Sequence, residues 1–477
     1  MKIAYVHHHL RPGGVTRVMK EQMACLEGEH EVVGIVGEPP ACPVGFPLII
    51  VPEIAYDRDR KIQASPEKTC EIILGKVRSI WKQGADVYHF HNPTLGKNKD
   101  FLKIIKLLKH KGAEVLLQIH DFAEDGRPWN YTPEPYPADC HYAVINKRDY
   151  LILLKAGLNK RGLHLLPNPV RGMDASPPPG LPGATEDFWR NLVLYPVRAI
   201  RRKNIGEAVL LSLFLPNNDH IGVTLEPTGS VDRKSYRDWV SFSKENRLRI
   251  RFGLGVTGGF EKLLAEARCF ITTSIKEGFG FCYLEPWTID RMVFGRLLPG
   301  ICSDFSEKGM SFDHLYSEIA VPLSFFDLNL FRSTWVRCYL EKMSRYGIRL
   351  SPDEAAGHFD ELVERGSVDF GCLNETLQKQ VTLNVMDDKS KLSKMKELNP
   401  KAENLGSIDF AYTWLTAENK RIVQQEYSIP KYTRLLMEVY EKVLNTRVSQ
   451  AMDKKIILDQ FTVPEKNQLL LCESAYE

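Results

Sequence analysis

The sequence predicts an α/β protein made of two tandem doubly wound domains that face each other across a cleft. Three observations predict this class: short apolar runs alternate with helical patterns, a segment rich in proline and glycine interrupts the alternation, and the alternation then restarts. A length of 477 residues exceeds one compact core and agrees with two or three domains. Ligands of doubly wound folds bind at the carboxyl ends of the strands, so the cleft is the expected site.

The first domain, residues 1–170, alternates strand candidates with amphipathic helical patterns. The strand candidates are Ile3–Val6, Glu31–Val36, Leu48–Val51, Asp86–Phe90, Glu114–Ile119, Tyr142–Ile145 and His164–Leu166. The helical patterns are Val15–Leu26, Glu67–Trp81, Lys99–Lys111 and Lys147–Ala156. Alternation at this spacing indicates a parallel sheet with helices on both faces.

A linker is expected over residues 171–186, because four prolines and three glycines within residues 171–183 exclude a helix or a strand. The second domain is expected over residues 187–425. Its strand candidates are Leu192–Val197, Gly222–Leu225, Arg249–Phe252 and Cys269–Thr273, and its helical patterns are Ile205–Phe214, Ser235–Lys244 and Phe260–Ala267. From about residue 306 to 404 the pattern becomes mostly helical, which indicates an insertion.

Composition and charge exclude several classes of protein. Apolar residues make up 43% and charged residues 26% of the chain, which excludes wholesale disorder. Sixty-three Lys and Arg against sixty Asp and Glu leave no basic excess of the kind that nucleic-acid-binding proteins carry. The ten cysteines are scattered, without a C-x-x-C pair, and no apolar run is long enough to span a membrane. We therefore expect a cytoplasmic protein with reduced thiols.

The motif EGFGFCYLE at residues 277–285 is the most specific signal for a ligand site. Gly278 and Gly280 let the backbone bend after a strand, and free N–H groups at the start of a following helix favour phosphate. A helix here would place Glu277 at the mouth of the turn and Glu285 about two turns deeper. Because carboxylates repel phosphate, sugar or ribose hydroxyls are their expected partners.

Two further signals follow predicted strands. Arg198 and Lys203 come directly after the strand Leu192–Val197, where cations would point into the cleft and bind phosphate. Gly13 and Gly14 separate the first strand from its helix and permit close approach of a ligand. Taken singly, a basic cluster is also typical of a solvated face and a glycine pair of a simple turn.

A fourth signal is His120-Asp121, which ends the strand Glu114–Ile119. An imidazole at that place would reach the same ligand, although a single histidine at a strand end is also typical of a structural role. The four signals occur in an order and on elements that fit one cleft.

With these motifs the chain resembles the retaining nucleotide-sugar glycosyltransferases of the GT-B fold, a large family that includes sucrose synthases and bacterial mannosyl- and glucosyltransferases. The resemblance covers most of the chain to about Pro299 and the final helices, residues 426–477, which we expect to pack back on the N-terminal domain. The matching pieces are Pro12-Gly13-Gly14, His120-Asp121, Asn146, Pro167-Asn168-Pro169-Val170, Arg198 with Lys203, and Glu277 with Glu285.

The resemblance implies that Arg198 and Lys203 hold the donor diphosphate, that Glu285 binds the ribose, and that Glu277 binds hydroxyls of the donor sugar. His120 would approach the sugar on its reacting side. The implied catalytic residues are His120, Glu277, Arg198 and Lys203. The implied donor site comprises Gly13, Gly14, Arg198, Lys203, Glu277, Gly278, Phe279, Gly280, Phe281 and Glu285.

The chain departs from the family pattern at two places. Val197 stands where a glycine usually precedes the diphosphate arginine, and Pro286-Trp287 stands where small residues usually follow Glu285. The second departure bears on the packing around the ribose.

The expected reaction moves a hexose with retention from a UDP- or GDP-sugar to a hydroxyl of a small sugar or related metabolite, with no tightly bound cofactor. The residues predicted to contact the acceptor are His9, Asp121, Arg127 and Tyr131, with Trp129 in the same loop. No metal site is expected, because the histidines at 7–9, 89 and 91 lack acidic residues at metal-ligand spacing. The basic amphipathic helix 99–111 is compatible with docking on an anionic membrane or with packing on the sheet.

Two other functions stay open at this point. An NAD(P)-dependent oxidoreductase would use Glu38, which follows the second strand, to bind a ribose, but the chain lacks the G-x-G-x-x-G spacing at Gly13. A catalytically silent binding protein with the same fold is the other alternative, and the presence of Arg198, Lys203, Glu277 and Glu285 together argues against it.

Overall fold

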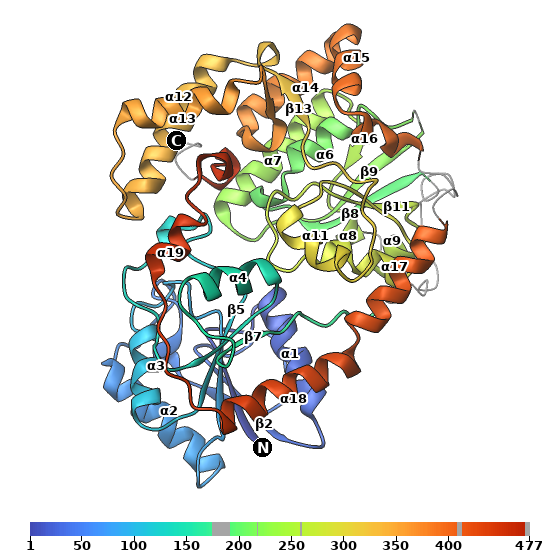
Figure 1. Ribbon diagram of the computed structural model, residues 1–477. Coiled ribbons are helices and arrows are strands. Elements are labelled where there is room, and N and C mark those ends of the chain that lie inside the picture. Colours follow the sequence, from blue (N-terminus) through green and yellow to red (C-terminus); the bar gives the residue numbers. More distant parts are fainter. Residues whose placement is uncertain (174–190, 217, 258–259, 408–412, 473–477) are drawn as a thin grey trace. The chain divides into compact units, whose positions relative to one another are not determined.

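The computed structural model in Figure 1 describes residues 1–173, 191–216, 218–257, 260–407 and 413–472. The chain forms two compact units. Unit 1 comprises residues 1–169 and 427–462, and unit 2 comprises residues 170–426 and the segment that begins at Val463. Each unit contains a parallel sheet of its own with helices between the strands, which confirms the predicted α/β class.

Unit 1 is built on a seven-stranded sheet with the strand order β3-β2-β1-β4-β5-β6-β7, in which every pair of neighbours is parallel. The strands are β1 Lys2–His7, β2 Glu31–Val36, β3 Leu48–Ile50, β4 Val87–His91, β5 Val115–Ile119, β6 His141–Val144 and β7 Leu163–Leu165. The central strands β1, β4 and β5 are almost wholly buried, as both faces of a parallel sheet must be.

The helices of unit 1 are α1 Gly14–Leu26, α2 Pro66–Ile80, α3 Phe101–His110, α4 Lys147–Lys155, α18 Ile429–Asn445 and α19 Lys454–Asp459, with 3-10 turns η1 Pro52–Ile54 and η2 Pro128–Asn130. Successive side chains of a strand point to opposite faces of the sheet, so β1 divides its residues between two cores. Ile3 and Tyr5 pack with α1 and α18, whereas Ala4 and Val6 belong to the core that α2, α3, α4 and α19 cover.

Unit 2 contains a five-stranded parallel sheet with the order β10-β9-β8-β11-β12. The strands are β8 Leu192–Arg198, β9 His220–Leu225, β10 Ile250–Arg251, β11 Cys269–Thr272 and β12 Val293–Gly295. The helices between them are α6 Ile205–Leu211, α7 Ser230–Glu245, α8 Leu254–Thr257, α9 Phe260–Glu266 and α10 Glu285–Thr288, with 3-10 turns η3 Arg201–Lys203 and η4 Phe281–Tyr283, and α11 Pro299–Ser306 follows the last strand. The three-residue strand β12 was not among the predicted strands.

The segment 306–404 is mostly helical, as expected, but it also contains a small antiparallel sheet. Its helices are α12 Leu328–Arg345, α13 Pro352–Val363, α14 Glu375–Asp387, α15 Lys389–Leu398 and α16 Pro400–Glu403, with 3-10 turns η5 Leu323–Phe325 and η6 Phe370–Cys372; α17 Thr413–Glu426 follows. The strands β13 Ala320–Pro322 and β14 Ser367–Asp369 pair with each other.

The segment expected over residues 426–477 divides between the two units. Helix α18 packs its apolar face against α1 in unit 1. The 3-10 turns η9 Pro464–Lys466 and η10 Leu469–Leu471 belong to unit 2, where Leu469 and Leu470 are buried and Trp335 donates to the Asn467 carbonyl at 3.2 Å. Most of the expected linker, residues 174–190, lies outside the described residues.

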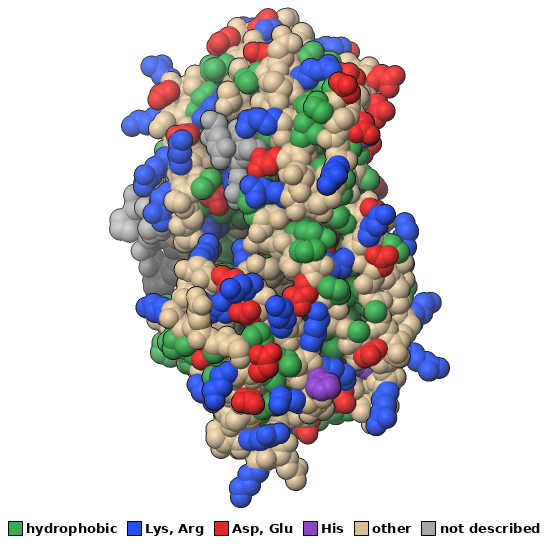
Figure 2. Space-filling model, turned by 90° about the vertical axis from the view of Figure 1, so that its left-hand side faces the viewer, with side chains coloured by type: hydrophobic (Ala, Val, Ile, Leu, Met, Phe, Trp, Pro, Cys, Tyr) green, Lys and Arg blue, Asp and Glu red, His purple; other side chains and the backbone are tan. Residues whose placement is uncertain are grey.

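The surface carries both signs of charge. Figure 2 shows basic and acidic side chains interspersed over the face that it displays, in keeping with a net charge of only +3. Among the helices that the structure describes, none is long and apolar enough to cross a membrane.

Candidate active site

The loop that follows β8 carries the predicted phosphate-binding cations. Arg198 is the last residue of β8 and is half-buried, and within the described part of the chain its side chain makes no hydrogen bond or ion pair. Lys203 ends the short turn η3, five residues further on. Both residues therefore lie at the carboxyl edge of the sheet in unit 2, where parallel α/β sheets bind ligands.

Side chains from the sheet hold the backbone of Lys203 in place. The Tyr195 hydroxyl donates to the Lys203 carbonyl at 2.7 Å, and the Thr273 hydroxyl donates to the carbonyls of Lys203 and Asn204 at 3.0 Å each. The Ile275 N–H donates to the Arg202 carbonyl at 3.0 Å. The loop after β8 and the loop after β11 are thus fixed to each other.

Glu277, in the loop after β11, accepts hydrogen bonds from two cations of the first loop. The Lys203 ammonium binds Oε1, and the Arg202 guanidinium binds Oε2 at 3.2 Å and the Lys276 carbonyl at 2.8 Å. Burial by itself would raise the pKa of Glu277, but Lys203 and Arg202 outweigh it and lower the pKa to about 2. The carboxylate is therefore ionised at every physiological pH.

This arrangement combines a carboxylate with several cations at one strand edge. A carboxylate whose lone pairs are only partly used can accept hydrogen bonds from sugar hydroxyls, and guanidinium and ammonium groups bind phosphate. Arg202 is a member of this cluster that sequence reasoning missed, although the run Arg201-Arg202-Lys203 signalled it.

The turn after Glu277 differs from its sequence prediction. Gly280 has a φ of 94°, and a Cβ there would lie 2.8 Å from Ile301, so the turn requires glycine. The expected continuous helix is absent: η4 and the four-residue α10 replace it, and Glu285 is the first residue of α10. The prediction of a helix terminus with Glu285 two turns deeper is therefore wrong.

The departure has a local cause. Pro286 lacks an N–H, so it cannot continue an existing helix and instead begins a new one. The buried Trp287 donates to the Tyr283 carbonyl at 2.7 Å, which fixes the break. Phe279 and Phe281 of the same turn pack edge to face, with their ring centres 5.0 Å apart.

In unit 1, His120 follows β5 as predicted. Asn92, which has a left-handed backbone with a φ of 55°, accepts hydrogen bonds from the N–H groups of His120 at 3.2 Å and Asp121 at 3.0 Å. His91 Nδ1 and His120 Nε2 are 3.0 Å apart and share a hydrogen bond. Burial lowers the pKa of His120 to about 4, so its imidazole is neutral near pH 7.

The predicted acceptor loop contains one ion pair and one anchored aromatic ring. Arg127 donates to Asp121 at 2.8 Å. Tyr131 lies elsewhere in the loop, with the Lys454 ammonium 4.7 Å from its ring centre. Lys454 also forms a buried ion pair with Glu124 at 3.5 Å, which ties the loop to α19.

His9 belongs to a cluster around the ring of Tyr56 that the sequence did not reveal. The rings of His8 and His9 are each centred 4.9 Å from the ring of Tyr56. The Lys97 ammonium lies 5.3 Å and the Arg58 guanidinium 5.7 Å from the Tyr56 ring centre. We call these residues the Tyr56 cluster; they follow β1, β3 and β4, and only the sheet order brings them together.

No protein-family model matches the chain. The chain is 27% identical to mannosylglucosyl-3-phosphoglycerate synthase from Petrotoga mobilis over 92% of its own length and 90% of the relative. Three solved structures share the fold: HepE from Anabaena in complex with UDP and glucose, a glycosyltransferase from Rickettsia africae, and sucrose-phosphate synthase from Thermosynechococcus elongatus. HepE matches with a TM-score of 0.52 and 12% identity over 92% of this chain and 99% of its own. The Rickettsia protein matches with a TM-score of 0.52 and 12% identity over 93% of this chain and 99% of its own. Sucrose-phosphate synthase matches with a TM-score of 0.51 and 11% identity over 93% of this chain and 98% of its own. The chain therefore has the GT-B fold, which these nucleotide-sugar glycosyltransferases share.

This result favours glycosyl transfer over the oxidoreductase and over the silent binding protein. Both carboxylate oxygens of Glu38 accept from Arg11, at 2.6 and 2.7 Å, so Glu38 does not stand ready as a ribose-binding acid.

Gly13 and Gly14 lie at the start of α1. Gly13 is the N-cap, no side chain caps the helix, and a Cβ on Gly14 would meet no atom within 4 Å. Packing within the protein therefore does not require glycine at position 14. Their part in donor binding stays a prediction.

The histidines near β1 and β4 form hydrogen bonds within the protein, and those of His7 and His8 go to backbone carbonyls. His7 Nδ1 lies 3.2 Å from the His91 carbonyl, and His8 Nδ1 lies 2.6 Å from the Ile54 carbonyl. Among the described residues no group of three or more His, Cys, Asp or Glu could hold a metal ion. On α3, Lys106 pairs with Glu134 at 2.9 Å and Lys109 with Glu114 at 3.1 Å, which neutralises part of its basic face.

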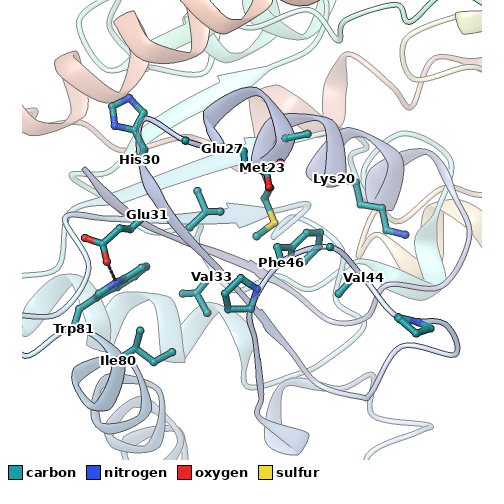
Figure 3. Close-up of a pocket in the computed structure, with 16 residues that line it drawn as sticks. Lys20, Met23, Glu27, His30, Glu31, Val33, Val44, Phe46, Ile80 and Trp81 are labelled. Atoms are coloured by element: carbon teal, nitrogen blue, oxygen red, sulfur yellow. Dashed lines mark hydrogen bonds between the residues drawn. The ribbon is translucent and has the colours of Figure 1, made fainter.

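A cavity of about 530 Å³ lies in unit 1 (Figure 3). Its walls come from α1, the start of β2, the segment before β3 and the end of α2, and Glu31 accepts a hydrogen bond from Trp81 there. The cavity therefore lies at the amino ends of the strands, and no predicted site residue lines it.

Proposed function

We propose that the glycosyltransferase moves a hexosyl group from a UDP- or GDP-sugar, with retention at the anomeric carbon, to a hydroxyl of a small sugar that carries phosphate or carboxylate. The observation that carries the donor half is the Lys203–Glu277 pair at the carboxyl edge of the sheet in unit 2. The acceptor half is supported by the likeness to the Petrotoga relative, whose name describes a product with mannosyl, glucosyl and 3-phosphoglycerate parts.

The proposed donor site follows from charge. When the bond between the anomeric carbon and the diphosphate oxygen breaks, negative charge grows on the departing diphosphate. Arg198 and Lys203 would stabilise that charge more than the ground state, which lowers the barrier. Because Lys203 and Arg202 already neutralise Glu277, the carboxylate can accept from sugar hydroxyls without repelling the diphosphate. Glu285, the first residue of α10, would bind the ribose.

The transfer requires no protein nucleophile in this proposal. The acceptor oxygen forms the new bond to the anomeric carbon on the face that the diphosphate leaves, and the acceptor proton passes to the departing diphosphate oxygen. His120 is neutral near pH 7, so it would donate or accept a hydrogen bond at the sugar without adding charge. Retention follows because the new bond forms on the face that the old one left.

An anionic acceptor group would find cations on unit 1. Arg58 and Lys97 hold their charged groups beside the Tyr56 ring, and the Arg58 side chain is 71% exposed. Arg11 pairs with Glu38 and Asp59, Arg127 pairs with Asp121, and the exposed Arg58 lies 3.5 Å from Asp59. Because Arg58 and Lys97 gather two positive charges at one ring, we assign them as the contacts for the phosphate or carboxylate of the acceptor, with His9 beside them.

The proposed function is tested by incubating the protein with UDP- and GDP-glucose and UDP- and GDP-mannose, each with glucosyl-3-phosphoglycerate, glucosylglycerate or glucose. We expect a disaccharide product with the phosphorylated acceptor and one of the donors. Proton NMR of the product should show the anomeric configuration of the donor. An inverted product would overturn retention, and equal rates with glucose would overturn the anionic acceptor.

Exchange of both cluster cations for neutral residues, in the variant Arg58→Gln/Lys97→Gln, should raise the acceptor KM. Loss of hydrogen bonds to a charged group costs about 1.5–3 kcal/mol, so we expect an increase of roughly ten- to a hundredfold. Slow hydrolysis of the donor without acceptor should keep its wild-type rate. Lys82→Gln, which removes an exposed lysine elsewhere in unit 1, is the matched control. An unchanged acceptor KM in the double variant would contradict the assignment.

A further inference from the structure

We propose that the segment 306–404 positions the donor-binding lysine, with Gln378 and the buried Arg296 network as the positioning residues. This inference rests on the proposed role of Lys203. It gives a function to the segment that the resemblance does not cover.

Asn204, the residue after Lys203, is the point at which the segment acts on the donor loop. Asn204 is buried and has a left-handed backbone with a φ of 50°. Asparagine tolerates this conformation better than most residues, and the hydrogen bonds of its side chain help to hold it there. The Asn204 side chain donates to Glu207 at 2.7 Å and accepts from Gln378 Nε2 at 2.9 Å.

Gln378 reaches Asn204 from α14, 174 residues further along the chain. Its Nε2 also donates to the Phe370 carbonyl at 3.2 Å, whereas its Oε1 is buried without a partner among the described residues. Gly206 allows this approach, because a Cβ there would lie 2.5 Å from Trp239 and would also collide with the Gln378 amide. The contact thus combines close packing with one directed hydrogen bond.

A second connection runs through Arg296, which is fully enclosed by charged and aromatic partners. Its guanidinium binds both oxygens of Glu207 and both oxygens of Asp369, the last residue of β14. The Tyr316 hydroxyl donates to Glu207 at 2.9 Å. Asp369 in turn accepts from the Ile319 and Gly371 N–H groups, so the small sheet of the segment is fixed to α6.

The chemistry of these contacts favours positioning over simple stabilisation. A buried ion pair contributes little net stability compared with apolar residues of the same volume, because both charges lose their hydration. Directed hydrogen bonds instead fix the orientation of the groups that they join. Glu207 and Gln378 form hydrogen bonds with the side chain of Asn204. The Thr273 hydroxyl forms hydrogen bonds with the carbonyls of Asn204 and Lys203. With the backbone held in this way, the Lys203 ammonium faces Glu277.

The test uses Gln378→Met, which removes the hydrogen bonds to Asn204 and to the Phe370 carbonyl and also removes the unpartnered buried oxygen. We expect a lower Tm, because two buried acceptors lose their donor, so the measurements are made at a temperature at which the variant stays folded. Hydrogen exchange of the amides of residues 201–204, measured without ligand, should become about fivefold faster. The donor KM should rise by a similar factor, and the acceptor KM should stay unchanged.

Gln380→Met is the matched control on the same helix, because Gln380 accepts from the Asp327 N–H and does not contact the donor loop. It should leave both the exchange of residues 201–204 and the donor KM at their wild-type values. Asp369→Asn, which weakens the second connection, should act in the same direction as Gln378→Met.

Unchanged exchange of residues 201–204 in both Gln378→Met and Asp369→Asn would overturn the inference. A merely structural role would lower the active fraction, and hence kcat, with both KM values unchanged, and would also overturn it. If the variants accelerate exchange but the wild-type protein transfers sugar from none of the UDP- or GDP-sugars, the positioning stands and the proposed function fails.

Discussion

Replacement of Lys203 by alanine should lower kcat by roughly 10²–10³-fold, the effect of removing one preorganised group that stabilises charge in the transition state. The structure adds a second reason: the ammonium is one of two cations that neutralise Glu277, which sits among buried groups. Without Lys203, the carboxylate keeps only Arg202 as its cationic partner, and its repulsion of the donor diphosphate increases. The loss should therefore appear in turnover at saturating donor.

The measurement is steady-state kinetics with the donor identified by the sugar panel. Lys234→Ala removes an exposed lysine of α7 in the same unit and should behave as wild type. Lys203→Arg should recover part of the activity, because it keeps the charge but changes the geometry. A Lys203→Ala variant with wild-type turnover at saturating donor would refute the proposed role.

Acidification from pH 6.5 towards pH 4 should unfold unit 1. Its sheet buries six histidines whose pKa values burial lowers: to about 4 for His8 and His120, to about 3 for His89 and His164, and well below the ordinary value for His7 and His91. In the unfolded chain these side chains take up protons below pH 6.5, whereas in the folded unit they stay neutral until their lowered pKa values are reached.

The sign of the effect follows directly. Between these two pKa values the unfolded state binds more protons than the folded state, so the free energy of unfolding falls as the pH falls. Each such histidine contributes about 1.4 kcal/mol per pH unit once it is fully protonated in the unfolded chain. Glu124 and Asp149, whose pKa values burial raises, act in the opposite direction but are only two groups. A domain stability of about 5–15 kcal/mol is therefore lost within one to two pH units.

Near-ultraviolet circular dichroism between pH 7.5 and pH 4 measures this transition, which we expect near pH 5. His89→Phe removes one buried titrating ring between Tyr5 and His91 and should move the midpoint to lower pH. His110→Gln, at an exposed position of α3, should leave the midpoint unchanged. A protein that stays folded at pH 4, or a midpoint that does not respond to His89→Phe, would contradict the expectation.

Much of the fold was predictable because its signals are local. The buried strands β1, β4 and β5 read as short apolar runs, and the caps Ser65 and Asn146 accept from backbone N–H groups three residues on, as such residues do at helix starts. The strands β12, β13 and β14 were not predicted, although the equally short strands β3 and β7 were. The helix after Glu277 was predicted too long, because Pro286 and the packing of Trp287 override the apolar pattern.

In the candidate site, too, the sequence predicted single residues but not the contacts between distant ones. The sequence by itself indicated Arg198, Lys203 and Glu277, because each follows a recognisable strand and carries a charge suited to phosphate or hydroxyl groups. Only the tertiary structure decided that β11 lies beside β8, which joins Lys203 to Glu277 across 74 residues, and that Gln378 meets Asn204 across 174. Periodicity and charge act between neighbours in the chain, whereas a pairing of distant side chains depends on strand order and on the packing of the whole core, which no local pattern encodes.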